Sequence, residues 1–154
     1  MNKDVSIIIV NYNTEKYIIN CLKSIYNQVK ELSYEIIIID NNSEDNSCSL
    51  IEQSNFNNLV LIKSSKNLGF GKANNLGIKK ALGKYIFLLN PDTILLNNVV
   101  KIFFDFMEEN SKDKIGAIGG MLFYEDNSIQ ESFGNFPTIT QVLFEFGLNR
   151  IFRD

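Results

Sequence analysis

Short apolar runs alternate along the chain with stretches in which apolar residues recur at helical spacing. Runs rich in β-branched residues predict strands at 5–10, 34–40, 59–64 and 84–90. Helical spacing predicts helices at 18–29, in the later part of 41–54, after the glycine-rich loop in 66–82, and at 97–110. The first two runs are apolar throughout, as in strands covered on both faces. The pattern predicts an α/β fold with a mostly parallel sheet flanked by helices.

The pattern changes beyond residue 110. The run 115–124 predicts a further strand, and the turn residues in 124–132 predict a hairpin. Large apolar residues at helical spacing in 138–152 need a cover, which a missing part of the protein, a partner or a second copy could supply. No repeat or linker interrupts the chain, so we expect a single domain over 1–154.

The composition limits the possible partners and the cellular location of the protein. The chain has 154 residues, 45% hydrophobic, with 15 basic and 18 acidic residues and a net charge of -3. This balance argues against nucleic acid and anionic lipid as partners. No apolar run is long enough to span a membrane, and Asp4 comes too early for a signal peptide, so we expect a cytoplasmic protein. Cys21 and Cys48 are predicted to be buried thiols in a reducing compartment.

Four polar clusters follow the four predicted strands: "NYN" at 11–13, "DNNS" at 40–43, "KNLGFGK" at 66–72 and "NPDT" at 90–93. Ligands of open α/β sheets bind outside the carboxyl ends of the strands. If the strands are parallel, the four clusters therefore converge on one site.

The first two clusters offer groups for a nucleoside. Asn11 and Tyr12 follow the first strand, and the Tyr12 ring could stack on a base or simply sit at the surface. Asp40 could accept hydrogen bonds from a base or a ribose, or could cap the next helix. Asn13 or Thr14 is the expected cap of the first helix.

The third cluster suits a phosphate. Gly69 and Gly71 let the backbone approach a ligand beside a helix start, whose N–H groups favour an anion, and Lys72 would add a positive charge. The cluster lacks the third glycine of a dinucleotide fingerprint and follows the third strand. Alternatively, Gly69 only closes a turn, and Asn74 and Asn75 are exposed helix residues.

The fourth cluster suits a divalent cation. Mg²⁺ and Mn²⁺ prefer oxygen ligands and are often held by one or two carboxylates together with substrate phosphates. Asp92 could supply one carboxylate, while Asn90 offers a neutral oxygen or a hydrogen bond to a ribose. Alternatively, the segment is a Pro-Asp turn in which Asp92 caps the following helix.

At these residues the sequence resembles the family 2 inverting glycosyltransferases of the GT-A fold, especially their rhamnosyltransferase-like branch. The resemblance runs through 6–25, 35–47, 67–93 and 119–137, in the family's order. It implies a UDP or dTDP sugar donor, with Tyr12 near the base and Asp40 bonding it. Asp92 matches the metal-binding aspartate of the family's DxD element, for Mg²⁺ or Mn²⁺. The implied donor site comprises Asn11, Tyr12, Asp40, Asn67, Gly69, Lys72, Asn75, Asn90 and Asp92.

The sequence departs from the family in two ways. Asn90 replaces the first carboxylate of the commonest DxD form, although "NPD" is usual in this branch. Similar members continue beyond residue 154 into a segment that binds the acceptor and carries the general base, so we expect a donor-binding portion. The late carboxylates Glu125, Asp126 and Glu131 lie in a hairpin that matches a non-catalytic element of the family, which leaves the base unassigned.

The resemblance implies transfer to a saccharide or lipid-linked acceptor in surface polysaccharide synthesis. With a lipid-linked acceptor the enzyme would work at the inner membrane face. A different class stays open: a non-catalytic module that binds a nucleotide sugar or docks through its apolar tail, including by self-association. A dinucleotide-dependent oxidoreductase is disfavoured, because "NYNTEKY" and no glycine fingerprint follows the first strand.

Overall fold

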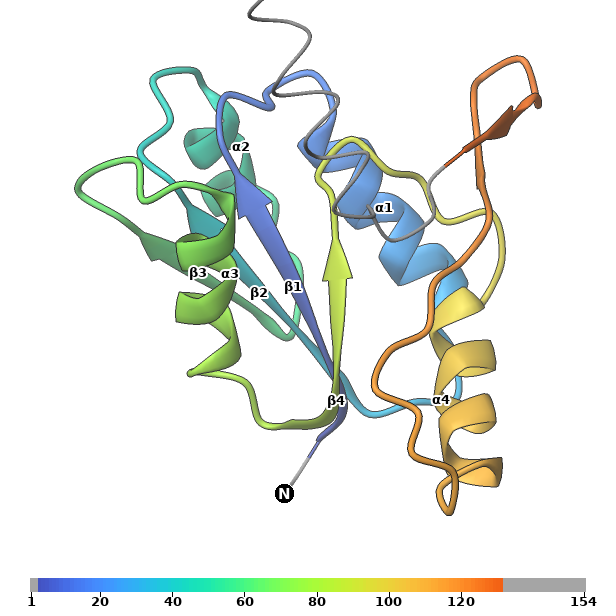
Figure 1. Ribbon diagram of the computed structural model, residues 1–154. Helices are drawn as coiled ribbons and strands as arrows, with labels where there is room; N and C mark the ends of the chain where they lie inside the picture. Colours follow the sequence, from blue (N-terminus) through green and yellow to red (C-terminus); the bar gives the residue numbers. More distant parts are fainter. Residues whose placement is uncertain (1–2, 132–154) are drawn as a thin grey trace, which may run out of the picture. The chain divides into compact units, whose positions relative to one another are not determined.

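Figure 1 shows the computed structural model, which describes residues 3–131. The chain divides into two compact units, residues 1–118 and 119–154, and each is considered by itself. The expectation of a single domain over 1–154 stays a prediction.

The first unit is built on a parallel sheet with the strand order β3-β2-β1-β4. The strands are β1 (Lys3–Asn11), β2 (Tyr34–Asp40), β3 (Leu59–Lys63) and β4 (Gly83–Leu89). All three neighbouring pairs are parallel, and Asn11 lies opposite Asp40 in the register of β1 and β2. The predicted mostly parallel α/β architecture is confirmed.

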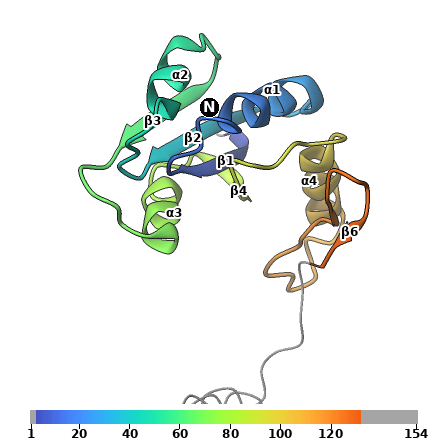
Figure 2. The same ribbon diagram turned by 90° about the horizontal axis from the view of Figure 1, so that it is seen from above.

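Four helices connect and follow the strands: α1 (Ile18–Gln28), α2 (Ser47–Gln53), α3 (Phe70–Ile78) and α4 (Val99–Glu109). Figure 2 shows α1 and α2 on one face of the sheet and α3 on the other. Helix α4 packs against β4, where Phe103 lies 6.1 Å from Phe87 and Phe104 lies 5.8 Å from Tyr85, measured between ring centroids.

The core is two-sided because β1 and β2 are covered on both faces. Ile7 and Ile9 of β1 face α1, whereas Val10 packs with Ala73 of α3. Burying each such aliphatic side chain contributes about 1.5–3 kcal/mol. The continuous apolar runs predicted for buried strands are therefore confirmed for β1 and β2.

Strand β4 is less buried than β1 and β2. Leu89 is buried, but Ile86 and Leu88 are 39% and 51% exposed. Ile86 and Leu88 pair with Ser6 and Ile8, so they lie on the sheet face that α3 covers over β1 and β2. Strand β4 is therefore half-buried within the described residues.

The second unit contains a small hairpin of β5 (Leu122–Phe123) and β6 (Ile129–Gln130). In its turn the Tyr124 N–H donates to the Ser128 carbonyl, the Asn127 N–H donates to the Tyr124 carbonyl, and Asn127 has a φ of 64°. The predicted hairpin is confirmed. The strand predicted at 115–124 is wrong outside Leu122–Phe123, because three glycines weaken the run and no described strand pairs with the rest.

The prediction of helical structure at 138–152 lies outside the described residues. Within residues 3–131, no helix is both long and apolar enough to cross a bilayer.

Candidate functional site

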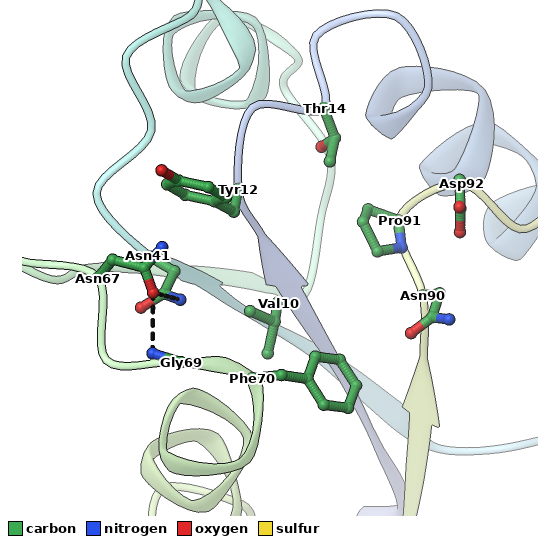
Figure 3. A pocket seen from close by; sticks show the side chains of 10 residues that line it. All are labelled: Val10, Tyr12, Thr14, Asn41, Asn67, Gly69, Phe70, Asn90, Pro91 and Asp92. Atoms are coloured by element: carbon green, nitrogen blue, oxygen red, sulfur yellow. Dashed lines mark hydrogen bonds between the residues drawn. The ribbon is translucent and has the colours of Figure 1, made fainter. Parts of the chain in front are cut away.

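A pocket of about 490 Å³ lies at the carboxyl ends of the strands of the first unit. All four strand-end loops contribute to it (Figure 3). Its lining residues are Val10, Tyr12 and Thr14 at the end of β1, Asn41 after β2, Asn67, Gly69 and Phe70 between β3 and α3, and Asn90, Pro91 and Asp92 after β4. The parallel sheet thus brings the four polar clusters together.

The structure places the predicted site residues in two groups. Tyr12, Asn67, Gly69, Asn90 and Asp92 line the pocket. The other four do not line it: Asn11 and Asp40 are buried at the ends of β1 and β2, and Lys72 and Asn75 are exposed on α3.

Asn11 and Asp40 form a buried polar layer at the carboxyl ends of β1 and β2. The Asn11 amide donates to Asp40 Oδ1 at 2.8 Å and to Ser47 Oγ at 2.8 Å. The Ser43 N–H donates to Asp40 Oδ2 at 3.3 Å. Both carboxylate oxygens of Asp40 are therefore engaged within the protein. The alternative role of Asp40 as a helix cap is wrong, because α2 begins only at Ser47.

The loop after β1 folds back on this layer. The Thr14 hydroxyl donates to Asn11 Oδ1, and the Thr14 carbonyl accepts the N–H groups of Tyr17 and Ile18. This extra turn delays the start of α1 to Ile18, with Tyr17 at the N-cap position and no side-chain cap. The predicted capping by Asn13 or Thr14 is therefore wrong.

Asn41 is a pocket residue that the sequence reasoning missed. It directly follows Asp40, and successive residues at the end of a strand point in opposite directions. Since Asp40 turns toward Asn11, Asn41 turns toward the β3–α3 loop, where its amide contacts Asn67 and Leu68. The alternation of side-chain direction along a strand, applied to "DN" at 40–41, could have identified Asn41 as a pocket residue.

The loop before α3 has the geometry of an open helix start. Gly69 has a φ of 77°, a conformation that favours glycine, and no side chain caps the helix. The first turn contains no acidic residue. The N–H groups at this helix start lack intrahelical partners and are available to an anion. Asn74 is buried and donates to the Phe70 carbonyl, so its predicted exposure is wrong.

The "NPDT" segment forms a turn in which the Thr93 N–H donates to the Asn90 carbonyl at 3.2 Å. Asp92 is exposed and does not cap α4, because Asn98 accepts the Lys101 N–H at that helix start. The Cys21 thiol contacts this turn, with its sulfur 3.7 Å from the Asn90 carbonyl oxygen. Burial and the Asp92 carboxylate raise the pKa of this thiol to about 12.

Asp92 is the charged residue among those that line the pocket. No group of three or more His, Cys, Asp or Glu side chains that could hold a metal occurs among residues 3–131. A cation here would therefore have Asp92 as its carboxylate ligand and would need further oxygens from a bound molecule.

Comparison with known proteins identifies the family to which this chain belongs. The sequence profile of the family described as "Glycosyl transferase family 2" matches residues 6–151. The chain belongs to glycosyl transferase family 2. One relative in this family is a poly(ribitol-phosphate) beta-glucosyltransferase of Bacillus spizizenii (strain ATCC 23059 / NRRL B-14472 / W23). It is 34% identical over 122 residues, which cover 76% of this chain and 19% of the relative.

Solved structures confirm the predicted GT-A fold class for this family 2 member. Residues 1–349 of S. aureus TarS, in complex with UDP-GlcNAc, match with a TM-score of 0.63 and 28% identity over 70% of this chain and 32% of that chain. A mannosyltransferase from Pyrobaculum calidifontis, in complex with GDP-Man and Mn²⁺, matches with a TM-score of 0.57 and 21% identity, over 64% and 30% of the chains. The latter likeness concerns the fold alone.

The family 2 relatives are longer than this chain. The matched part covers 15% and 43% of the first two curated relatives. The chain therefore spans less than half the length of these glycosyltransferases.

Proposed function

We propose that the pocket binds the nucleotide part of a nucleotide-diphosphate sugar and forms the donor site of an inverting glycosyltransferase of the rhamnosyltransferase-like branch. The observation that carries this proposal is the meeting of the four strand-end loops at one pocket in a family 2 chain. Its volume of about 490 Å³ lies within the usual range for small-molecule sites. The complex of TarS with UDP-GlcNAc supports a UDP sugar, and a dTDP sugar is the alternative.

Tyr12 is the proposed platform for the base. Its ring is 45% exposed and lies at the edge of the pocket, near Asn41 and Asn67 (Figure 3). An exposed ring can stack on any base through its π face. Asp40, which the resemblance assigns to base bonding, would have to give up a protein hydrogen bond to reach a ligand. We propose that it acts by holding the loop beneath the base.

The start of α3 is the proposed diphosphate site. The uncapped first turn that follows Gly69 presents backbone N–H groups, and a Cβ atom at Gly69 or Gly71 would meet nothing within 4 Å. This open space allows a phosphate to approach the backbone. Lys72 and Asn75 lie on the same helix and are exposed, so they would act as outer contacts to the charged group.

Asp92 is the proposed ligand of Mg²⁺ or Mn²⁺. It is an exposed carboxylate, and Asn90 beside it offers a neutral amide, so the donor set suits a hard cation. The cation would offset the charge that grows on the leaving diphosphate.

The general base remains unassigned. In an inverting transfer it removes the proton of the acceptor hydroxyl that attacks the anomeric carbon. Among the late carboxylates, Asp126 accepts the N–H and hydroxyl of Ser128, which lowers its pKa and makes it a weaker base. Glu125 and Glu131 carry no feature that supports the role.

The proposed acceptor is a saccharide or a lipid-linked saccharide in surface polysaccharide synthesis. The activity named for the Bacillus relative, which concerns a poly(ribitol-phosphate), supports a cell-surface polymer. With a lipid-linked acceptor the protein would work at the inner membrane face.

Calorimetric titration with UDP, dTDP and GDP sugars, with and without Mn²⁺, tests the proposal. We expect binding that strengthens with Mn²⁺, and we expect Asp92→Ala to lose that strengthening. Asp113→Ala, at an exposed aspartate outside the pocket lining, is the matched control and should behave like the wild type. Binding that ignores Mn²⁺ in all three proteins would refute the metal assignment. Absence of binding to every nucleotide sugar would refute the donor site.

A transfer assay separates this proposal from a non-catalytic module. Release of the nucleotide from its sugar in the presence of an acceptor requires a complete catalytic site. Binding without turnover would favour the module.

A further inference from the structure

Two asparagine amides join the end of β2 to the loop before α3. Asn41 Nδ2 donates to Asn67 Oδ1 at 2.8 Å, and the Leu68 N–H donates to Asn41 Oδ1 at 2.8 Å. Asn67 Oδ1 also accepts the Gly69 N–H at 2.8 Å. Figure 3 shows these side chains beside Gly69 at the pocket. We call these three hydrogen bonds the Asn41–Asn67 bridge.

Backbone donors determine which way each amide points. The Leu68 N–H can only donate, so Asn41 must present its oxygen to Leu68 and its nitrogen to Asn67. The Gly69 N–H likewise requires the oxygen of Asn67. Both requirements are met at once, and each amide has one consistent orientation. Asn41 is 3% exposed, so little water competes for its bonds.

We propose that Asn41 is a positioning residue. Its amide holds the segment 67–69 in the shape that turns the start of α3 toward the diphosphate, before the ligand arrives. The inference rests on the proposed function, because it concerns the same diphosphate site.

The bridge explains why residue 41 is an asparagine. The position must donate and accept at the same time, which a carboxylate cannot do. Asn67 uses only its oxygen in the bridge, so an aspartate at 67 could make the same two contacts. The bridge is therefore asymmetric: aspartate is excluded at 41 and tolerated at 67.

The bridge restrains Gly69, a residue with a positive φ at the start of α3. Gly69 has a φ of 77° immediately before the first helical residue, so its conformation sets the direction of the helix start. Glycine is conformationally free, and its N–H bond to Asn67 restrains it. A loop held in its binding shape binds more tightly, because less ordering is required on binding.

Hydrogen exchange of the Gly69 amide tests the bridge without any ligand. In Asn41→Asp, the Asn67 amide must either face a carboxylate with its oxygen or turn and release the Gly69 N–H. We expect Gly69 exchange to rise about tenfold. In Asn67→Asp, which adds the same charge, exchange should stay within about twofold of the wild type. Equal exchange in the two variants would overturn the bridge.

Binding of UDP and of uridine tests the positioning role. Asn41→Ala removes the amide and adds no charge. We expect its affinity for UDP to fall about tenfold, while affinity for uridine, which has no phosphate, stays unchanged in NMR titrations. Thermal unfolding of the same variant reports any general loss of stability. Equal losses for UDP and uridine, or no loss for either, would overturn the positioning role. Failure of the wild type to bind UDP would instead count against the proposed UDP site, and the exchange experiment would still decide on the bridge.

Discussion

The Asn11 amide donates to the buried Asp40 carboxylate at 2.8 Å, and so joins the carboxyl ends of β1 and β2. The two residues are partners in the register of the sheet. Asp40 also accepts the Ser43 N–H, so it organises the loop that follows β2. A carboxylate that is buried and fully paired contributes to the site through the backbone that it holds.

Asp40→Asn should destabilise the protein. The variant has a single acceptor oxygen, so its NH₂ group would face the N–H group of Asn11 or of Ser43. Leaving a buried donor without a partner costs about 1–3 kcal/mol, which urea unfolding measures. Asp113→Asn, at an exposed position, should change stability by less than about 0.5 kcal/mol. Wild-type stability in Asp40→Asn combined with lost UDP binding would indicate that Asp40 contacts the nucleotide directly.

Tyr12→Ala should weaken UDP binding and leave the fold intact, because the ring is exposed. Loss of a stacked ring costs about 1–3 kcal/mol, or roughly tenfold to hundredfold in affinity. Tyr12→Phe retains the ring and should bind like the wild type. Tyr17→Ala removes an exposed tyrosine outside the pocket lining and serves as the second control. Calorimetry on the wild type and the three variants checks the prediction. Unchanged UDP affinity in Tyr12→Ala would show that Tyr12 does not bind the base.

Gly83→Ala should destabilise the sheet at the end opposite the pocket. A Cβ atom there would lie 2.3 Å from Ser6 N and 2.6 Å from Val5 C, which are backbone atoms that cannot move aside. Overpacking of this kind costs about 1–3 kcal/mol. In contrast, a Cβ at Gly71 meets nothing within 4 Å, so Gly71→Ala should leave stability unchanged or slightly raised. Thermal unfolding measures both, and equal melting temperatures would contradict the packing at Gly83.

Alkaline pH should destabilise the protein. Burial, with a smaller contribution from Asp92, raises the pKa of Cys21 from 9.0 to about 12, and burial raises that of Tyr26 from 10.0 to about 12. The unfolded groups lose their protons first, so unfolding releases protons, and stability falls as the pH rises from about 9 to 12. Urea unfolding across this range measures the slope. Cys21→Ala should flatten it, and an unchanged slope in the variant would show that the Cys21 thiol does not contribute.

Much of the fold followed from local pattern. The isoleucine runs of β1 and β2 are apolar on both faces, which only a covered strand requires. The predicted bounds of β2 agree with the structure, whereas β1 runs from Lys3 to Asn11 and is longer than the predicted 5–10. The convergence of the loops followed because parallel strands end at one edge of a sheet. The hairpin at 122–130 followed from its turn residues. Local pattern failed at 115–121, where an apolar run has no partner strand among residues 3–131.

The sequence by itself determined the α/β order of elements and the four loops, because apolar periodicity and turn chemistry act over a few residues. Only the tertiary structure decided what each polar side chain contacts. Asp40 faces Asn11 and Asn41 faces Asn67, partners that are 29 and 26 residues away in sequence. A carboxylate and an amide at adjacent positions look equally suited to a ligand. Strand alternation points the two side chains in opposite directions, and tertiary packing decides that Asn41 lines the pocket while Asp40 is buried against Asn11.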